Sequence, residues 1–530
     1  MKICLINAKG PRGTMRSIPH GLMQIQADMK RAGHEADIWD YNLGGGVKHD
    51  ESKLKNYDLI GLSAMSTQLP HAMTITETLP KGHPVVWGGV HANLDPASIL
   101  NRFPDHFVIS GEGEIPLLSL LEGLEQKHGK EWLAEQPGIS FREKDKNILN
   151  KSYFHSDINE LADVNYKDLP YFEMYLEHWE PWFGFNAKSL PVLVSRGCFW
   201  NCNFCINALY KKQGGNYRAK SFDKIRRETS ELIDEYHFRF VEPRAEDLFG
   251  DRKLLAQWEA YAQEKNFLWC ANARFNYLGK GLYSGEDIKR LSSHGFYNIN
   301  MAVEAGCEQV RNDILNKKVT DKDIKKSVEI IQEIGKSRLA VGTSFVTHFP
   351  GDTPENRIEI IKLMDYLSKN TNILFSGPQI YRPYPGSKLY QFQEDKEEGN
   401  LDFYLDQFDE QGTPAQNASS LPGMFWGEML MRYFNRRYEQ LRYPGDQELR
   451  VAGTTGKKPF SNLLLSIAMA PIWLRLKLNF WGLFVDPYIL PIVYRGLRWV
   501  NLEPLRPRIR QSLAAIPILK KIKQRIAPNL

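Results

Sequence analysis

The chain has 530 residues, of which 42% are hydrophobic and 25% charged, and it carries a formal net charge of +5. This length predicts three or four domains, and the composition excludes a disordered, collagen-like or small disulfide-rich protein. We find no run of 18 apolar residues and no signal peptide, and six cysteines are too few for a disulfide framework. We therefore expect a cytoplasmic protein in a reducing compartment, where clustered cysteines usually bind metal.

Residues 1–150 show short apolar segments that alternate with helical patterns. The expected strands are 2–7, 35–40, 59–63, 85–87 and 107–109, and residues 21–32 have helical spacing that ends before Gly33. This alternation predicts an α/β fold with a doubly wound, Rossmann-like parallel sheet. Such sheets bind ligands beyond the carboxyl ends of their strands, which here carry residues 63–67, 88–91 and 111–114. The glycines at these ends either admit a bulky ligand or only turn corners.

A second alternation follows an aromatic, weakly periodic segment, residues 151–188, which we interpret as a linker. Residues 189–395 contain expected strands at 191–195, 238–242, 268–271, 298–303, 339–345 and 373–380, with helices between them such as 222–236, 321–334 and 354–368. Six such units predict a partial (β/α)6 barrel, whose functional groups should lie at the carboxyl ends of its strands. A helical extension is expected over residues 396–456.

The C-terminal region, residues 457–530, is basic and mainly helical in pattern. It contains 13 lysines and arginines but only two acidic residues. Apolar stretches too short to cross a bilayer, rich in tryptophan and flanked by basic residues, are typical of a peripheral membrane anchor. The alternative is a helical cap on the barrel with a solvated basic face. An anchor would place the protein on the inner face of the membrane and favour a lipid substrate, such as a polyisoprenoid, or a tetrapyrrole intermediate.

Three cysteines follow the first barrel strand at the spacing CxxxCxxC: Cys198, Cys202 and Cys205. Three thiolates within eight residues can converge on one soft metal centre. Structural zinc sites prefer four ligands, and the other three cysteines of the chain are isolated. The spacing therefore favours a [4Fe–4S] cluster whose fourth iron stays open, and the alternative is a set of plain core cysteines.

This cysteine segment and the residues after it resemble the radical S-adenosylmethionine (SAM) superfamily. The resemblance implies that the three cysteines hold the cluster, that the open iron binds SAM, and that one electron cleaves SAM to a 5′-deoxyadenosyl radical. The electron would come from a donor such as flavodoxin or ferredoxin. The residues that the resemblance assigns to SAM are Phe204, Glu246, Asp247 and Glu304. Residues 348–351 and 381–387 resemble later elements of the superfamily and of one of its subgroups.

That subgroup is the cobalamin (B12)-binding-domain radical SAM enzyme family, and residues 1–115 resemble its N-terminal domain. The resemblance rests on residues 19–22 and 32–34 and on the glycine-containing strand ends. The residues that it assigns to cobalamin are Ser63, Thr67, Gly88, Gly89, His91, Gly111 and Glu112. Residues 7–12 lack the histidine of the DxHxxG motif, so either cobalamin binds without histidine ligation or the domain is a relic. We expect His91 to form a wall of the pocket rather than to bind cobalt, and the alternative is a satisfied surface histidine.

The combination of cofactors implies C-methylation of an unactivated carbon on a small-molecule or lipid-like substrate. A first alternative is a cobalamin-assisted radical cyclase or oxygenase that acts on a tetrapyrrole or a similar substrate. A second is an RNA-modifying radical SAM enzyme, because a basic tail also suits nucleic acid. Methylthio-transferring relatives carry three further N-terminal cysteines, however, and residues 1–150 contain only Cys4, so we do not expect a nucleic-acid partner. A third is a non-catalytic membrane protein with a structural cluster. No residue is singled out as catalytic.

Overall fold

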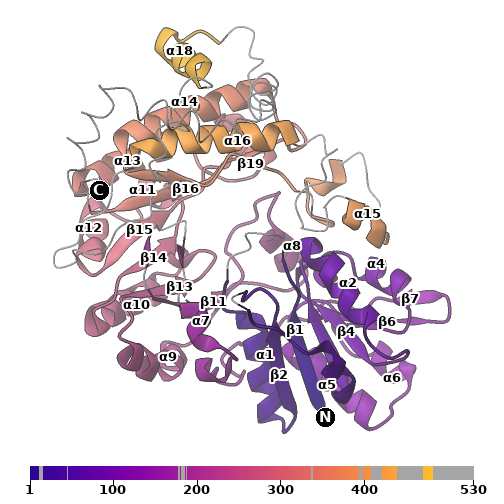
Figure 1. Cartoon of the computed structure of the whole chain (residues 1–530). Coiled ribbons are helices and arrows are strands. Elements are labelled where there is room, and N and C mark those ends of the chain that lie inside the picture. Colours follow the sequence, from indigo (N-terminus) through magenta and orange to yellow (C-terminus); the bar gives the residue numbers. More distant parts are fainter. Residues whose placement is uncertain are drawn as a thin grey trace, which may run out of the picture.

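The computed structural model describes residues 1–10, 16–44, 46–176, 179–180, 185–186, 188–335, 338–382, 384–392, 398–406, 421–438 and 469–481. Figure 1 shows two α/β units side by side, with the N-terminal unit in indigo and purple and the barrel in magenta to orange. The end of the loop that corresponds in position to the DxHxxG motif, residues 11–12, lies outside the described residues. The same holds for residues 407–420, 439–468 and 482–530, which include most of the expected helical extension and basic C-terminal region.

The N-terminal domain is a doubly wound α/β unit, as predicted. Its parallel strands have the order β2-β1-β3-β4-β5, with bounds β1 Lys2–Asn7, β2 Glu35–Asp40, β3 Leu59–Ser63, β4 Val85–Gly88 and β5 Phe107–Ile109. Alternate residues of β1 face opposite cores: Ile3 and Leu5 pack with α1 (His20–Arg31) and α5 (Glu114–Glu125). Cys4 and Ile6 pack with α2 (Leu69–Glu77) and α4 (Pro96–Arg102). The strand order reverses between β1 and β3, which places the ligand crevice at the carboxyl ends of these strands.

A β-hairpin that the sequence analysis missed extends this sheet. β6 (Ile139–Glu143) pairs antiparallel with β5, and β7 (Lys146–Ile148) pairs antiparallel with β6. The turn between them contains Lys144 with a φ of 53°, a left-handed backbone conformation that residues other than glycine adopt only rarely. The charged turn lacks the usual Asn-Gly signal, which is why the pattern did not predict a hairpin.

The second domain is the predicted partial barrel. Its six parallel strands among the described residues are β10 Ser189–Leu193, β13 Phe240–Arg244, β14 Trp269–Asn272, β15 Phe296–Asn300, β16 Ala340–Thr343 and β18 Ile373–Phe375. A parallel bridge between Phe240 and Leu268 joins β13 to β14, so the strands follow one another in chain order. The predicted segment 373–380 divides into β18 and β19 (Gln379–Ile380), because Gly377 and Pro378 interrupt it.

The barrel helices begin at capping residues. α9 (Phe222–Tyr236) follows Ser221, whose Oγ accepts a hydrogen bond from the backbone of Lys224, and α13 (Asp321–Ile334) starts with a capping box formed by Thr320 and Asp323. Both helices have the bounds that the periodicity predicted. The other outer helices include α10 (Arg252–Lys265), α12 (Gly285–Ser293) and α14 (Pro354–Asn370). Two short elements flank the cysteine segment, namely β11 (Ser195–Arg196) before it and α8 (Ile206–Lys212) after it.

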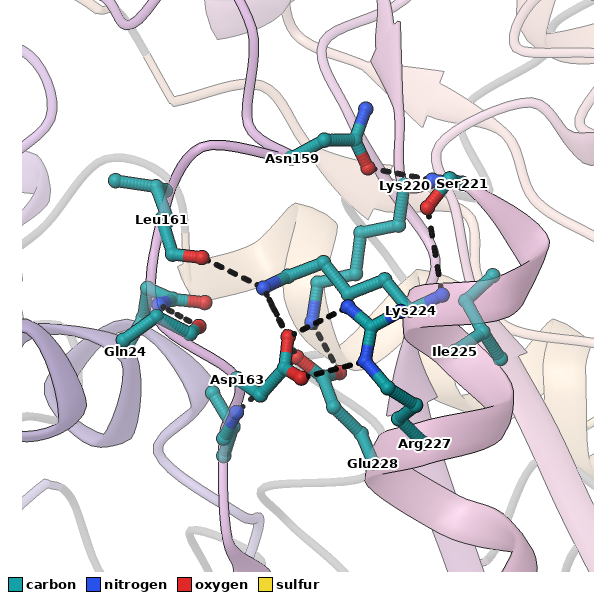
Figure 2. Close-up of polar contacts among 12 residues, drawn as sticks. Gln24, Asn159, Leu161, Asp163, Lys220, Ser221, Lys224, Ile225, Arg227 and Glu228 are labelled. Carbon is teal, nitrogen blue, oxygen red and sulfur yellow. Dashed lines mark hydrogen bonds and ion pairs between the residues drawn. The ribbon is translucent and has the colours of Figure 1, made fainter.

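The linker fixes the two domains to each other through buried polar contacts, which Figure 2 shows. On the barrel side, Glu228 lies between Lys220 and Lys224, with shortest distances of 2.5 and 3.7 Å. Lys224 also donates to the Leu161 carbonyl and contacts Asp163 of the linker at 2.7 Å. On the N-terminal side, Gln24 of α1 donates to the Ala162 carbonyl at 2.9 Å. The linker therefore lies between α1 and α9 and contacts both helices.

The elements after the barrel pack on both domains. α15 (Leu401–Asp406) returns to the N-terminal domain, where the Tyr404 hydroxyl donates to Asp95 at 3.0 Å and Leu401 joins its core. α16 (Leu421–Phe434) packs on the barrel instead, and its Trp426 is fully buried. α18 (Ala470–Leu478) buries Met469 and Ile472 against the same core. No helix in the described part of the chain is long and apolar enough to span a bilayer.

Candidate functional site

Two cavities meet between the N-terminal sheet and the mouth of the barrel. The interdomain cavity, of about 570 Å³, lies at the carboxyl ends of β3, β4 and β5 and faces the barrel. The barrel cavity, of about 720 Å³, lies within the barrel mouth. Both cavities are lined by Asn207, Arg244, Glu246, Asn272 and Asn300. We call these five residues the shared wall.

The three predicted cluster ligands, Cys198, Cys202 and Cys205, all line the barrel cavity. Burial raises the pKa of the Cys198 thiol, and it raises that of Cys205 to about 11. Metal binding therefore has to displace protons from these thiols. Within the described residues, no three His, Cys, Asp or Glu side chains lie close enough to hold a single ion. In a four-iron cluster, by contrast, each thiolate binds a separate iron.

Nitrogen donors point at two of these sulfur atoms. Arg274 places Nη1 3.7 Å from the Cys202 sulfur, and Asn207 places Nδ2 3.8 Å from the Cys205 sulfur. Hydrogen bonds to the sulfur atoms are one means by which proteins set the reduction potential of an iron–sulfur cluster. Arg274 also stacks on the Trp200 ring at 3.8 Å from its centroid. The donor set thus fits a cluster that three cysteines hold and that leaves one iron open to the cavity.

Glu304 lies in the barrel cavity, where the resemblance placed a SAM contact. Its carboxylate pairs with Lys317 at 3.0 Å, and both side chains are buried. The backbone of Glu304 has a φ of 74°, a left-handed conformation that costs energy in a residue with a side chain. Hydrogen bonds to Ser344 and Val346 hold it there. The backbone thus directs a paired carboxylate into the cavity.

The other residues assigned to SAM also line the barrel cavity. Phe204 lies under the Lys317 ammonium at 6.0 Å from its ring centroid, and Glu246 stands on the shared wall. Asp247 accepts hydrogen bonds from Trp200 at 2.9 Å and from the Tyr277 hydroxyl at 2.5 Å. One of its oxygens positions the cysteine loop, whereas Oδ1 is buried without a hydrogen-bond partner among the described residues. Direct contact of these residues with SAM stays a prediction.

Two adjacent glycines after β4 have different roles at the interdomain cavity. A Cβ atom added to Gly88 would meet nothing within 4 Å, so this position opens onto the cavity. A Cβ added to Gly89 would lie 2.9 Å from backbone atoms of Ala64, and Gly89 has a φ of 86°. Gly88 therefore leaves a cradle that a ligand can fill, whereas Gly89 is required by the fold itself. The N-terminal wall of this cavity is mainly apolar and includes Leu22, Ile25 and Leu117.

Glu112 lines the same cavity, but its carboxylate is already engaged by the barrel. It contacts Arg218 at 2.8 Å and Arg196 at 3.3 Å, and Arg196 contacts Glu114 at 2.7 Å. Arg196 lies two residues before Cys198. The loop of Gly111 and Glu112 therefore ties the N-terminal sheet to the cysteine loop, a role that the sequence analysis did not assign. Ser63 and Gly111 also line the interdomain cavity, as expected.

His91 and Thr67 do not line either of the two cavities. The expectation that His91 forms a pocket wall is corrected, because its side chain is buried in the domain core. Its ring nitrogens contact Ser66 Oγ at 3.0 Å and Ser98 Oγ at 3.1 Å, and its ring packs against Tyr404. Burial lowers its pKa to about 4. His91 is thus a satisfied histidine, but in the core and not on the surface as the alternative expected.

Sequence reasoning missed several residues that shape the site: His20, Arg196, Arg274, Asn300 and Lys317. Arg196 stood beside the cysteine motif, and Arg274 and Asn300 stand at or just after strand ends, which was the available signal. His20 lay in residues 19–22, which the resemblance used only to place the N-terminal domain, and Lys317 gave no signal. Only the tertiary fold brings these two residues to the barrel cavity.

Comparison with known proteins agrees with this architecture. The family model of the Radical SAM superfamily matches residues 192–364, and that of the B12 binding domain matches residues 14–121. An uncharacterized methyltransferase of Pyrococcus horikoshii is 25% identical over 388 residues, which cover 71% of this chain and 78% of that protein. The bacteriochlorophyllide d C-8(2)-methyltransferase of Chlorobaculum tepidum is 22% identical over 387 residues, with 70% and 75% covered.

Two solved structures share the fold. The radical S-adenosylmethionine methyltransferase TsrM from Kitasatospora setae, with cobalamin and a [4Fe–4S] cluster bound, gives a TM-score of 0.57 at 13% identity and covers 83% of this chain and 96% of TsrM. The cobalamin-dependent S-adenosylmethionine radical enzyme OxsB, with aqua-cobalamin and S-adenosylmethionine bound, gives a TM-score of 0.57 at 14% identity, with 99% and 75% covered.

A three-cysteine loop at the mouth of a partial barrel, next to a doubly wound domain, defines a radical SAM enzyme with a second cofactor domain. The chain belongs to the cobalamin (B12)-binding-domain radical SAM enzyme family. The cofactors of this family are a [4Fe–4S] cluster, SAM and cobalamin.

Proposed function

We propose that the protein is a cobalamin-dependent radical SAM methyltransferase that methylates a carbon atom of a small-molecule substrate. One observation carries this proposal: the cavity with the three cysteines and the cavity of the B12-binding domain meet at one shared wall. A reacting carbon at this wall could be reached from both cofactor sites. The methyltransferases among the relatives support the same reaction class.

When bound, the cofactors supply a 5′-deoxyadenosyl radical and a transferable methyl group. The residues of this chain hold and orient them. Cys198, Cys202 and Cys205 would bind the cluster, and Arg274 would donate toward one of its sulfur ligands. Lys317 would hold the Glu304 carboxylate ready for the SAM ribose. The open space over Gly88 would receive the tail of cobalamin.

The shared wall and the domain interface would exclude water from the reaction. A closed site protects a reactive radical from side reactions, and it fixes the distance between reacting atoms. The contacts of Arg196 with Glu112 and Glu114 place the cysteine loop against the B12-binding domain. These ion pairs would hold the two cofactor sites at a fixed distance and orientation.

The proposal is tested with protein reconstituted anaerobically with iron, sulfide and hydroxocobalamin. We expect about four irons per chain. With SAM and a reductant, we expect 5′-deoxyadenosine from reductive cleavage and S-adenosylhomocysteine from methyl donation, both measured by chromatography. Cys202→Ala should abolish the deoxyadenosine, whereas Cys307→Ala, at a cysteine that lines neither cavity, should not. Deoxyadenosine without S-adenosylhomocysteine would instead indicate a cyclase or oxygenase.

We further propose two partners. An electron donor such as flavodoxin or ferredoxin would reduce the cluster. An anionic membrane surface would be contacted peripherally through α18 and the residues directly after it, where the Trp473, Leu478 and Phe480 side chains are 49%, 63% and 60% exposed. Lys477 lies over the Trp473 ring at 4.9 Å, so basic and aromatic groups share this surface. Such pairing suits the interface of a bilayer.

A further inference from the structure

The shared wall is polar at every position. It consists of one cation, one carboxylate and three carboxamides, in Arg244, Glu246, Asn207, Asn272 and Asn300. Arg244 ends β13, Asn272 ends β14 and Asn300 ends β15, so these side chains stand at the carboxyl ends of neighbouring barrel strands. Catalytic and binding groups of such barrels are found at this edge. The wall lies where the two cofactor sites meet, which is the place for a substrate.

These polar groups keep capacity for hydrogen bonds. Asn272 uses Nδ2 on the Ala245 carbonyl at 2.9 Å. The Asn300 carboxamide makes no hydrogen bond to any other residue in the described part of the chain. Arg244 contacts Glu242 at 3.0 Å, and the arginine side chain remains 41% exposed toward the cavities. Its guanidinium carries N–H donors in a planar fork, and this exposed part of the side chain lines both cavities.

His20 adds an acceptor from the opposite domain. It begins α1, lines the barrel cavity and packs edge-on against Tyr166. Its Nε2 is buried and has no hydrogen-bond partner among the described residues. Burial, together with the positive charges of Arg244, Lys220 and Arg196, lowers its pKa to about 3. A neutral imidazole with an unused ring nitrogen can accept or donate one hydrogen bond.

The opposite side of the interdomain cavity is mainly apolar. Leu22, Ile25 and Leu117 of the N-terminal domain line it. A broad planar cofactor can lie against this side, whereas the polar groups gather on the barrel side. The asymmetry separates a surface for a cofactor from a surface for a hydrogen-bonding substrate.

We infer that the substrate is a polar small molecule that presents an acidic group, a carboxylate or a phosphate, to Arg244 and hydrogen-bonding groups to Asn272, Asn300 and His20. Arginine is suited to both anions because its planar donors match two oxygen atoms at once. A lipid chain at this wall would bury the polar groups without partners, which is unfavourable. The inference rests on the proposed methyltransferase function and departs from the lipid substrate that the basic C-terminal region suggested.

The test uses the reconstituted enzyme, SAM with a tritiated methyl group, and two extracts of the cells that produce this protein. One is an aqueous methanol extract and the other a chloroform extract. We expect tritium to enter a product in the aqueous extract and this product to bind an anion-exchange column. A subsequent phosphatase treatment that releases the product from the column distinguishes a phosphate from a carboxylate. The Cys202→Ala enzyme serves as the blank.

Variants of the wall sharpen the test. Asn300→Leu and Arg244→Met should each lower tritium transfer about tenfold or more, because each removes hydrogen bonds to the substrate. Asn56→Leu, at an exposed asparagine of η1 (Glu51–Asn56), should transfer like the wild type. Cobalamin and iron contents are measured in every variant and should be unchanged.

Three outcomes would overturn the inference. Tritium in a chloroform-soluble product would identify a lipid substrate and leave the methyltransferase function intact. Transfer that Asn300→Leu preserves or increases would show that the wall does not bind polar groups of the substrate. Absence of tritium from both extracts, with SAM cleavage retained, would contradict the methyltransferase function itself and remove the basis of the inference.

Discussion

At the scale of single residues, the two adjacent glycines Gly88 and Gly89 serve different purposes, the first ligand binding and the second folding. Gly88→Leu should place a side chain in the open space of the interdomain cavity and reduce the cobalamin retained after desalting at least tenfold. Its iron content and thermal unfolding should stay close to wild type, because the cluster lies in the other domain. Gly89→Leu should instead lower the unfolding temperature, because its Cβ meets backbone atoms. Equal cobalamin retention by Gly88→Leu and wild type would remove Gly88 from the binding site.

His91 should make the stability of the apo protein depend on pH. Its pKa is about 4 in the folded protein and about 6.5 when unfolded, so the unfolded chain binds more protons between these values. The contribution of neutral His91 to the free energy of unfolding is complete above pH ~6.5. It decreases as the pH falls toward ~4, with a loss of about 2 kcal/mol by pH ~5.

His91→Gln should lose this part of the pH dependence. Denaturant unfolding curves of both proteins at several pH values give the two slopes. The glutamine protein should show the shallower decline on acidification, and parallel declines would contradict the assignment of a neutral, buried His91.

At the scale of elements, α18 should contact membranes through one face. Exposed Trp473 of the helix and Phe480 just after it can enter the interface, and nearby basic residues gain about 1 kcal/mol each beside an anionic leaflet. The Trp473→Ser, Phe480→Ser protein should sediment less with phosphatidylglycerol vesicles than wild type, and high salt should weaken binding of both. Leu149→Ser, at an exposed position of the N-terminal domain, is the control. Unchanged sedimentation of the double variant would exclude α18 as the contact.

The structure also changes how this region should be tested. A chain cut at Gly456 would lack the whole basic C-terminal region, and it would be the direct test of a membrane anchor. Met469 and Ile472 are, however, fully buried in the core that the barrel helices share, and Lys362 of α14 lies over the Trp481 ring. Truncation would remove this packing as well as the exposed face. Surface substitutions isolate the membrane contact from the structural one.

Regular elements could be read from the sequence, because their signals are local. Strong amphipathic periods and caps defined α9 and α13, and apolar runs defined the parallel strands. The cluster site was predicted from the CxxxCxxC spacing, which is also a local signal. The shared wall could not be predicted, because Asn272 and Asn300 are ordinary strand-end residues until the barrel brings them together. His91 was misplaced since its motif position does not reveal that Ser66 and Ser98 satisfy its ring.

At the scale of the whole molecule, the buried charges of Figure 2 should stabilise the arrangement of the domains. The side chains of Glu228, Lys220 and Lys224 are 0%, 4% and 1% exposed. Glu228→Gln leaves two buried ammonium groups without this carboxylate, and removing one partner of a buried pair costs about 3–5 kcal/mol. Denaturant unfolding should show a loss of this size. Arg226→Gln, which breaks an exposed pair with Glu264, should cost less than about 1 kcal/mol.

A loss in Glu228→Gln no larger than in Arg226→Gln would show that this buried charge cluster does not contribute to stability. A variant that is destabilised but still folded gives a second readout. Its deoxyadenosine yield should fall at unchanged iron content, because the linker also sets the distance between the two cofactor sites.

The return of α15 to the N-terminal domain has a consequence for evolution. The chain passes from the N-terminal domain to the barrel through the linker and returns before Gly399, whose amide donates to Asp95 alongside the Tyr404 hydroxyl. It passes to the barrel again between α15 and α16. The B12-binding domain is therefore not an interchangeable cassette. A recombination event that exchanged only the first 150 residues would separate the pocket for Leu401 and Tyr404 from its occupants. An exchange of this domain that preserves its packing has to include the segment with Leu401 and Tyr404 as well as the first 150 residues.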